Sequence, residues 1–307
     1  MNSNEPSAVF APAIQGCDFF LPLEDYDLAQ TLASGQAFRW HSVRGAWEGT
    51  VGETWVRLEV VPGGVRAHCA VPQTDWGWLS YYLGAHEDLR AVHATFPQDP
   101  PMRAALSFCP GLRLLRQEPW ECLASFILSS TKQIVQIQQI VALLCARYGR
   151  QLPTPADALP AYSFPSARTL ADLTEADLRA CKMGFRAPYL WQTASFVADG
   201  VVDLKTVGKR PLDEAREILT SLPGVGPKIA DCVLLFAYGF QQAFPVDVWV
   251  LRALRELYFP RRRPSVRRLR EFSSTHFGPF AGYAQQYLFH YVRLRPPAPA
   301  AAKFLST

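Results

Sequence analysis

Leu222-Pro223-Gly224-Val225-Gly226-Pro227-Lys228 is a glycine-rich turn between two segments with helical patterns. Before the turn, apolar residues at helical spacing and acidic residues near the start predict a helix over 211–222. Gly224 and Gly226 lack a Cβ, so the backbone there can take a positive φ and approach a ligand closely. Pro227 suits the first position of a second helix, predicted over 227–239. The free N–H groups at the start of that helix favour an anion.

Lys228 and a later carboxylate give this turn a chemical role. Lys228 falls on the first turn of the second predicted helix, where the helix dipole disfavours a protonated amine. A free amine is a nucleophile for Schiff-base chemistry, although on the turn alone a lysine that contacts a phosphate is the simpler interpretation. Asp247, in Pro245-Val246-Asp247, could stabilise positive charge on a sugar or move a proton. It could equally cap a helix predicted over 247–258. An amine and a carboxylate beside a phosphate-binding turn indicate chemistry on DNA.

These residues together resemble the helix–hairpin–helix, Gly/Pro-Asp superfamily of DNA glycosylases, and the lysine resembles that of its bifunctional glycosylase/lyase members. Three further segments are similar to the 8-oxoguanine DNA glycosylases: Ser34-Gly35-Gln36-Ala37-Phe38-Arg39-Trp40, Ala230-Asp231-Cys232 and Gly278-Pro279-Phe280-Ala281-Gly282-Tyr283-Ala284-Gln285. Four separated segments in family order are a much stronger indication than one motif.

The resemblance implies a reaction and a set of roles. Lys228 would attack C1′ of a flipped-out nucleotide, Asp247 would stabilise the developing positive charge, and β-elimination would nick the strand. In the base pocket, the carbonyl of Gly35 would accept the N7 proton that distinguishes 8-oxoguanine from guanine. Gln285 would read the Watson–Crick edge, and Phe289, four residues later on the same helix face, would stack on the base. Cys232 would stack opposite Phe289. Core packing is the alternative role for Phe289 and Cys232.

The DNA-binding residues both keep and depart from the family pattern. The hairpin residues Gly224, Val225 and Gly226 would hold a phosphate. Phe185 resembles an aromatic wedge, and Arg186 resembles one of two arginines that recognise the opposite cytosine. Gln136 replaces the other arginine. Thr131 and Lys132 stand where the family has asparagines, the first of which contacts the orphaned partner base. Trp249 replaces a histidine that contacts a phosphate. We therefore expect weaker discrimination for cytosine opposite the lesion.

Composition limits the other possibilities. The 307 residues are 49% hydrophobic, enough for two packed units, and carry a net charge of +4. A cluster of arginines indicates either a phosphate-facing surface or a solvated face, two interpretations that stay open here: Arg261, Arg262, Arg263, Arg267, Arg268 and Arg270. The seven cysteines form no Cys-x-x-Cys pair, which argues against disulfides and against the iron–sulfur loop of endonuclease III-like relatives.

The same inventory predicts no metal and no cofactor, because the histidines have no metal-ligand spacing and no nucleotide-binding glycine loop is present. No run reaches about 20 apolar residues, so no membrane span is predicted. The N-terminus lacks a signal pattern, and we expect an intracellular monomer, in the cytoplasm or nucleoid of a bacterium or the nucleus of a eukaryote. Its predicted partner is double-stranded DNA with an oxidised purine.

The chain is predicted to be α+β and mostly α. We expect a flexible lead over 1–13, a β-rich domain over 14–115, a helical domain over 116–294 and a disordered tail over 295–307. Four β-like runs, at 36–41, 46–51, 54–61 and 65–71, with a turn at Pro62-Gly63-Gly64, predict an antiparallel sheet. Pro119 begins a helix that resumes after Ser129–Gln133 and ends near Gly149, and 152–165 is a connection. Further helices are predicted at 175–182, 187–199, 211–222, 227–239, 247–258, 265–276 and 279–292. The active site is predicted in a cleft between helical subdomains, closed on one side by the Gly35 loop.

Two other functions fit the same residues less well. One is a related glycosylase for an oxidised pyrimidine or an alkylated purine; Gly35, Gln285 and Phe289 favour a purine without deciding the lesion. The other is a DNA-binding module that uses the hairpin alone, and the presence of both Lys228 and Asp247 argues against it.

Overall fold

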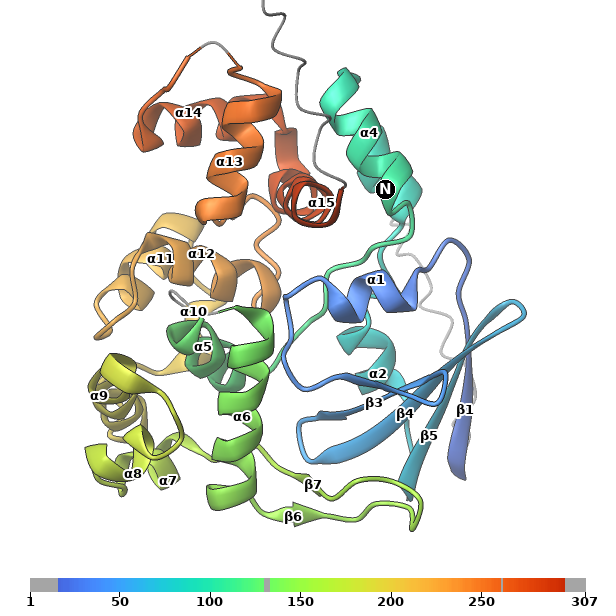
Figure 1. Cartoon of the computed structure of the whole chain (residues 1–307), viewed down its shortest axis with the longest axis vertical. Helices are drawn as coiled ribbons and strands as arrows, with labels where there is room; N and C mark the ends of the chain where they lie inside the picture. Colours follow the sequence, from blue (N-terminus) through green and yellow to red (C-terminus); the bar gives the residue numbers. More distant parts are fainter. Residues whose placement is uncertain (1–15, 130–132, 261, 296–307) are drawn as a thin grey trace, which may run out of the picture.

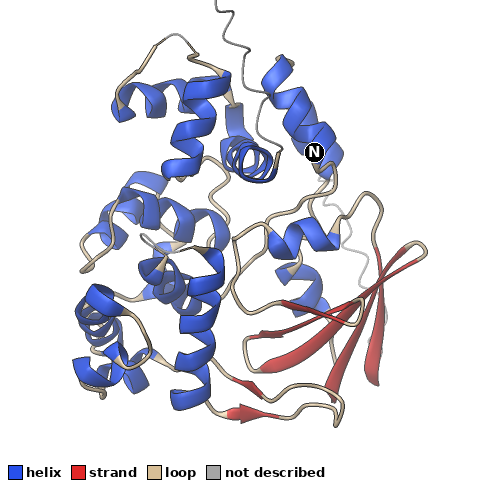
Figure 2. Ribbon diagram, viewed as in Figure 1, coloured by secondary structure: helices blue, strands red, loops and turns tan. Residues whose placement is uncertain are grey.

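The computed structural model describes residues 16–129, 133–260 and 262–295. A sheet lies on one side of the molecule and helices form the rest (Figures 1 and 2). The predicted flexible lead lies outside the described residues, as do Thr131, Lys132, Arg261 and the predicted tail beyond Arg295. Within the described ranges, no helix is both long and apolar enough to cross a membrane.

The larger sheet is five-stranded and antiparallel, in the order β1-β5-β4-β3-β2. Its strands are β1 (Gly16–Pro22), β2 (His41–Val43), β3 (Ala46–Val51), β4 (Thr54–Val61) and β5 (Gly64–Gln73). The predicted turn between β4 and β5 is confirmed, since Val61 pairs with Gly64 and Gly63 has φ +82°. A second, two-stranded sheet of β6 (Gln151–Leu152) and β7 (Ala161–Tyr162) lies within the predicted connection.

The predicted strand over 36–41 is wrong, because this segment is an irregular loop and β2 begins only at His41. A side chain takes the place of a neighbouring strand. The Gln36 amide Nε2 donates to the Arg113 carbonyl at 2.8 Å, and the Leu115 N–H donates to Gln36 Oε1 at 2.8 Å. The strand-like pattern over 36–41 does not reveal that the buried Gln36 side chain, rather than a backbone ladder, makes the hydrogen bonds to the backbone at 113–115.

The helices follow the predicted order, with short additions. Those of the N-terminal third are α1 (Leu28–Ala33), α2 (Gly77–Tyr82), α3 (Leu89–Ala94) and α4 (Pro100–Phe108). The remaining ones are α5 (Pro119–Leu128), α6 (Ile134–Tyr148), α7 (Ala167–Ala171), α8 (Glu175–Arg179), η1 (Gly184–Arg186), α9 (Ala187–Ala198), α10 (Leu204–Val207), α11 (Leu212–Thr220), α12 (Pro227–Phe236), α13 (Val248–Leu257), α14 (Val266–His276), η2 (Gly278–Phe280) and α15 (Ala281–Leu294). Neither β1, α1, α7 nor α10 was predicted.

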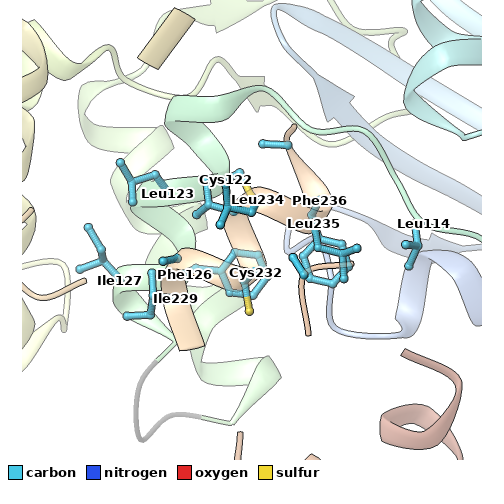
Figure 3. Packing of buried hydrophobic residues seen from close by; sticks show 14 of the residues in the cluster. Leu114, Cys122, Leu123, Phe126, Ile127, Ile229, Cys232, Leu234, Leu235 and Phe236 are labelled. Carbon is cyan, nitrogen blue, oxygen red and sulfur yellow. The ribbon is translucent and has the colours of Figure 1, made fainter. Parts of the chain in front are cut away.

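Two packing arrangements position the site. α12 packs on α5, where Leu123, Phe126 and Ile127 meet Ile229 and Cys232 (Figure 3). The C-terminal α15 lies between α13 and α4, and so joins the late helices to an element from the first third of the chain (Figure 1). The resulting large apolar core is separate from a smaller one under the sheet.

Candidate active site

A cavity of about 550 Å³ lies where α5, α6, α12, α13 and α15 meet the loop after α1. Such a volume is typical of small-ligand sites in proteins. Its lining includes seven residues singled out in the sequence: Gly35, Lys228, Cys232, Asp247, Trp249, Gln285 and Phe289. The fold therefore brings together residues from opposite ends of the chain.

In the hairpin between α11 and α12, the backbone conformation and the lack of space for a Cβ require glycine at position 224. Gly224 has φ +75°, and a Cβ there would lie 2.6 Å from the Cβ of Tyr189. Gly226 does not take the positive φ that its lack of a Cβ allows; it is extended at φ −91° and is the N-cap of α12. No atom lies within 4 Å of where its Cβ would be, so this part of the hairpin is open to a ligand. Pro227 begins α12, as predicted, and leaves the N–H groups of the first turn for an anion.

Lys228 points to the end of α5. Its Nζ donates to the Ser129 hydroxyl at 2.9 Å and lies 5.2 Å from the centre of the Phe126 ring. The Ser129 hydroxyl itself donates to the Phe126 carbonyl at 2.7 Å, so its oxygen is left to accept from the lysine. The hydrogen bond to Ser129 uses one N–H of the Lys228 amine and holds the nitrogen at the wall of the cavity.

Asp247 both caps a helix and lines the cavity. Its Oδ1 accepts from the Val250 N–H at 2.8 Å, which makes it the N-cap of α13, as one of the two interpretations predicted. Burial raises the pKa of the Asp247 carboxyl above its usual value, while the Val250 N–H and nearby Lys228 act to lower it. The capping bond fixes the carboxylate beside the amine, in a place where charge interactions are weakly screened.

The opposite wall is formed by the loop after α1 and by α15. Gly35 has φ +79°, and a Cβ there would lie 2.6 Å from Ile134 Cδ1. The preceding Ser34 carbonyl accepts from the Gln286 amide at 3.1 Å, which ties the loop to α15. The side-chain oxygen of Gln285 is buried and has no hydrogen-bond partner among the described residues. A buried acceptor without a partner is costly, so this amide is suited to a ligand.

Cys232 lies one turn after Lys228 on α12 and is 3% exposed. Burial raises the pKa of its thiol to about 12, so the sulfur is a neutral apolar surface in the cavity wall. Figure 3 shows it close to Phe126, among the side chains between α5 and α12. The cavity places Cys232 and Phe289 in the same lining, and their stacking on a base stays a prediction.

The lining also includes residues that were not predicted as part of the site, among them Phe38, His290 and Arg293. His290 is fully buried and its Nε2 contacts the Gln30 side-chain oxygen. The Arg293 guanidinium donates to the Ala33 carbonyl at 2.9 Å. A signal for Arg293 was available, since it follows Gln285 and Phe289 at four-residue spacing and so shares their helix face.

The predicted DNA-facing residues lie elsewhere on the surface. Phe185 is 54% exposed, and the Arg186 guanidinium lies 4.7 Å from the centre of its ring. Gln136 is exposed, and its side-chain oxygen accepts from the Gln133 N–H at 3.0 Å, so it caps the start of α6. Trp249 instead lines the cavity, with Arg252 over its ring. Contact of any of them with DNA stays a prediction.

The arginine cluster lies on α14 and in the segment before it. All five described arginines of the cluster are exposed, and Arg267 and Arg268 also contact Glu271. The contacts with Glu271 neutralise part of the positive charge of the cluster. Both interpretations of the cluster, a phosphate-facing surface and a solvated face, stay open. Across the described part of the chain, no group of three or more His, Cys, Asp or Glu side chains could hold a metal ion.

Comparison with known proteins identifies the family. Residues 19–123 match the 8-oxoguanine DNA glycosylase N-terminal domain, and residues 124–278 match the HhH-GPD superfamily of base excision DNA repair proteins. A probable N-glycosylase/DNA lyase of Methanothermobacter thermautotrophicus is 32% identical over 302 residues, 89% of this chain and 95% of that protein. The N-glycosylase/DNA lyase OGG1 of Arabidopsis thaliana is 32% identical over 279 residues, 85% of this chain and 76% of that protein.

Solved structures give the same result. The Clostridium acetobutylicum 8-oxoguanine glycosylase/lyase, in complex with double-stranded DNA containing cytosine opposite to 8-oxoguanine, superposes with a TM-score of 0.83 and 32% identity, over 88% of this chain and 92% of that one. Its apo-form gives 0.85 and 31%, over 92% and 99%. These matches confirm the family and fold predicted from four short segments. The chain belongs to the 8-oxoguanine DNA glycosylase/lyase family, within the HhH-GPD superfamily of base excision DNA repair proteins.

Proposed function

We propose that this protein excises 8-oxoguanine from double-stranded DNA through a Schiff base on Lys228 and then nicks the strand by β-elimination. The observation that carries the proposal is one cavity with two different walls. Lys228 and the partly buried carboxylate of Asp247 form what we call the catalytic wall, and Gly35, Gln285 and Phe289 form what we call the recognition wall; all five residues line the same cavity. A nucleotide held between them would present its sugar to the amine and its base to the polar groups that can identify it.

The first step is the exchange of the base for the amine. The nucleotide leaves the duplex, as chemistry on a base requires. The Lys228 nitrogen forms a bond to C1′ while the glycosidic bond breaks, and the base leaves with the bonding electron pair and takes up a proton. Asp247 stabilises the positive charge that develops on the sugar. Loss of the C1′–O4′ bond then opens the ring and gives a protonated Schiff base.

The second step is strand cleavage. A proton leaves C2′, its electrons form the C2′–C3′ double bond, and the C3′–O bond breaks with departure of the 3′ phosphate. The Schiff base accepts electron density from C2′ and so lowers the cost of losing that proton. Water finally hydrolyses the Schiff base and returns Lys228 as a free amine.

Recognition of the base is assigned to the other wall. The Gly35 carbonyl would accept from N7–H of 8-oxoguanine, a proton that guanine lacks, and Gln285 would bond to the pairing edge. One hydrogen bond discriminates strongly when the wrong base leaves a buried acceptor without a partner. Phe289 and Cys232 would cover the two faces of the base.

Discrimination of the base opposite the lesion should be weak. Gln136 is shorter than an arginine and uncharged, and its side-chain oxygen is engaged in capping α6, so its amide N–H groups offer a cytosine fewer and weaker hydrogen bonds than a guanidinium would. Base release measured with adenine, cytosine, guanine or thymine opposite 8-oxoguanine should therefore vary by less than about tenfold, or 1.4 kcal/mol. A strong preference for cytosine would contradict this prediction, and Arg186 would be the next residue to substitute.

The function is tested by single-turnover release of the base from duplexes that carry 8-oxoguanine, an oxidised pyrimidine, an alkylated purine or guanine at one position. Fastest release of 8-oxoguanine, with strand nicking, is expected. Faster release of another lesion would replace 8-oxoguanine as the substrate. DNA binding without release of any base would favour a binding module.

A further inference from the structure

Arg293 lies inside the cavity at the end of the recognition wall. A Cβ on Gly35 would be 3.4 Å from Arg293 Nη1, so the guanidinium lies directly beside the Gly35 backbone. The centre of the Phe289 ring is 5.2 Å from the guanidinium carbon. Arg293 therefore adjoins two of the residues assigned to the base, Gly35 and Phe289, on a helix that also supplies Gln285.

The charge of this guanidinium is poorly matched in the free protein. Arg39 and Arg116, two other arginines with little exposure, contact Glu121 at 3.0 Å and Glu87 at 3.1 Å. Among the described residues, no carboxylate is within 4.0 Å of Arg293, and its buried Nε has no hydrogen-bond partner. Burial lowers the pKa of Arg293, and Asp247 acts to raise it, so the side chain stays charged at neutral pH. A desolvated cation with spare donors is suited to an acceptor oxygen.

The partners that Arg293 does have leave it available. Its Nη2 donates to the Ala33 carbonyl at 2.9 Å and lies 3.3 Å from His290 Nδ1. Burial lowers the pKa of His290 to about 4, so the imidazole is neutral at pH 7 and adds no charge. These contacts orient the fork from one side, and Nη1 remains next to the Gly35 backbone.

The geometry of α15 indicates where an extruded base would lie relative to Arg293. Gln285, Phe289 and Arg293 follow at four-residue steps, so they form one row about 12 Å long on α15. A purine stacked on Phe289 with its pairing edge toward Gln285 has its five-membered ring at the other end, toward Arg293. That ring carries C8, whose oxygen is the group added by oxidation.

We propose that Arg293 donates a hydrogen bond to an oxygen of the extruded nucleotide, and that it helps to select the lesion when this oxygen is the one on C8. This inference rests on the proposed function and adds a residue to it. The row on α15 and the proximity to Gly35 favour the C8 oxygen, and a phosphodiester oxygen beside the same nucleotide offers the same acceptor chemistry. With the C8 oxygen, Gly35 and Arg293 would read the N7–H donor and the C8 acceptor as a pair.

Binding to three duplexes separates these sources. The full chain carries Lys228→Gln to prevent cleavage, and its affinity is compared with and without Arg293→Met by fluorescence anisotropy. The duplexes contain 8-oxoguanine, 8-oxo-7-deazaguanine or a tetrahydrofuran abasic analogue. 8-Oxo-7-deazaguanine keeps the C8 oxygen but lacks the N7 proton. The abasic analogue has the phosphates without a base. Arg295→Met, which removes an arginine that contacts Glu256, is the matched control on the same helix.

For the C8 oxygen, Arg293→Met should weaken binding of both modified bases about 10- to 100-fold, the range for a hydrogen bond to a charged group, and leave the abasic duplex within about twofold. Equal weakening on all three duplexes, without a change in melting temperature, would assign the phosphate. Arg293→Lys should retain much of the affinity, and it serves in place of the methionine variant if that variant does not fold.

Two results would overturn the inference. One is no loss beyond that of Arg295→Met on any duplex. The other is a loss on 8-oxoguanine that vanishes on the 7-deaza base, since Arg293 would then act only by placing Gly35. In both cases the unsubstituted chain still releases 8-oxoguanine. A chain with Lys228 intact that releases no 8-oxoguanine would instead reject the proposed function, and this inference with it.

Discussion

The two walls of the cavity are built in different ways. Lys228 and Asp247 come from α12 and α13, which follow each other along the chain. The recognition wall joins α15 to α1 and to the loop after it through three contacts between residues at least 252 positions apart: Gln286 with Ser34, His290 with Gln30, and Arg293 with Ala33. The proposed reacting groups thus lie on neighbouring helices, where a turn and a cap place them, whereas the proposed recognition groups depend on how the two ends of the chain pack.

This difference predicts which changes are separable. A substitution in the catalytic wall should stop chemistry and leave the fold and DNA affinity almost unchanged, because Asp247 is held by the cap of its own helix and the Lys228 side chain makes a hydrogen bond to Ser129 at the surface of the cavity, outside the apolar core. A substitution in the recognition wall should alter selectivity and, where a long-range contact is lost, stability as well. The four predictions below test this contrast.

The largest effect is expected from Lys228→Gln. The glutamine amide cannot form a Schiff base, so strand nicking should be abolished. Affinity for the duplex should change by less than a few fold, because the hairpin N–H groups remain. Nicking is followed on denaturing gels, with Lys209→Gln, an exposed lysine, as the control. Nicking at the rate of the unsubstituted protein would show that Lys228 is not the nucleophile.

Asp247→Asn isolates the charge from the cap. Asparagine is as good an N-cap as aspartate, so α13 and the melting temperature should be preserved. Base release should slow by more than about tenfold, or 1.4 kcal/mol, since the positive charge on the sugar loses its counter-charge. Asp203→Asn, which changes the capping aspartate of α10 outside the cavity, is the control. A smaller loss would leave Asp247 as a cap only.

Gly35→Ala probes the recognition wall, with Gly45→Ala as a matched control. Both glycines have strongly positive φ, +79° and +86°, so both substitutions should cost about 1 kcal/mol of stability. Only at Gly35 would the new methyl group meet a side chain, Ile134 at 2.6 Å, and shift the carbonyl. Discrimination between 8-oxoguanine and guanine should fall about tenfold or more for Gly35→Ala. Equal discrimination in the two variants would contradict the assigned role.

His290→Gln tests the long-range contact through pH. The folded-state pKa of His290 is about 4, below the ordinary value of 6.5, so the unfolded chain binds the proton first as pH falls. Stability from the neutral imidazole is therefore complete above pH 6.5 and declines by about 1.4 kcal/mol per pH unit down to about pH 4. Urea unfolding at pH 7 and pH 5 should show a smaller decline for His290→Gln. An identical decline would mean that other groups cause it.

The difference between local features and long-range contacts also explains which parts of the structure the sequence could predict. The hairpin, the start of α12 at Pro227 and the cap at Asp247 follow from local rules about glycine, proline and short acidic side chains, and the structure has them. Strands β3 and β4 were predicted with their observed bounds from alternation and the turn at Gly63. The roles of Gly35, Gln285 and Phe289 were available only through family resemblance.

What was missed is non-local. The segment at 36–41 looked like a strand, because nothing nearby shows that the Gln36 amide bonds to the distant Arg113 carbonyl. The contact of Lys228 with Ser129 joins residues 99 positions apart, and that of Arg293 with Ala33 joins residues 260 apart. Such pairs depend on how α12 packs on α5 and how α15 meets α1, which no local pattern encodes.

The central claim is that the Lys228 amine becomes covalently bound to the sugar. The most direct measurement is borohydride reduction during reaction with an 8-oxoguanine duplex, followed by peptide mapping of the cross-linked protein by mass spectrometry. One adduct is expected, on the peptide that contains Lys228. No adduct while the base is released, or an adduct on another lysine such as Lys182 or Lys205, would contradict the central claim.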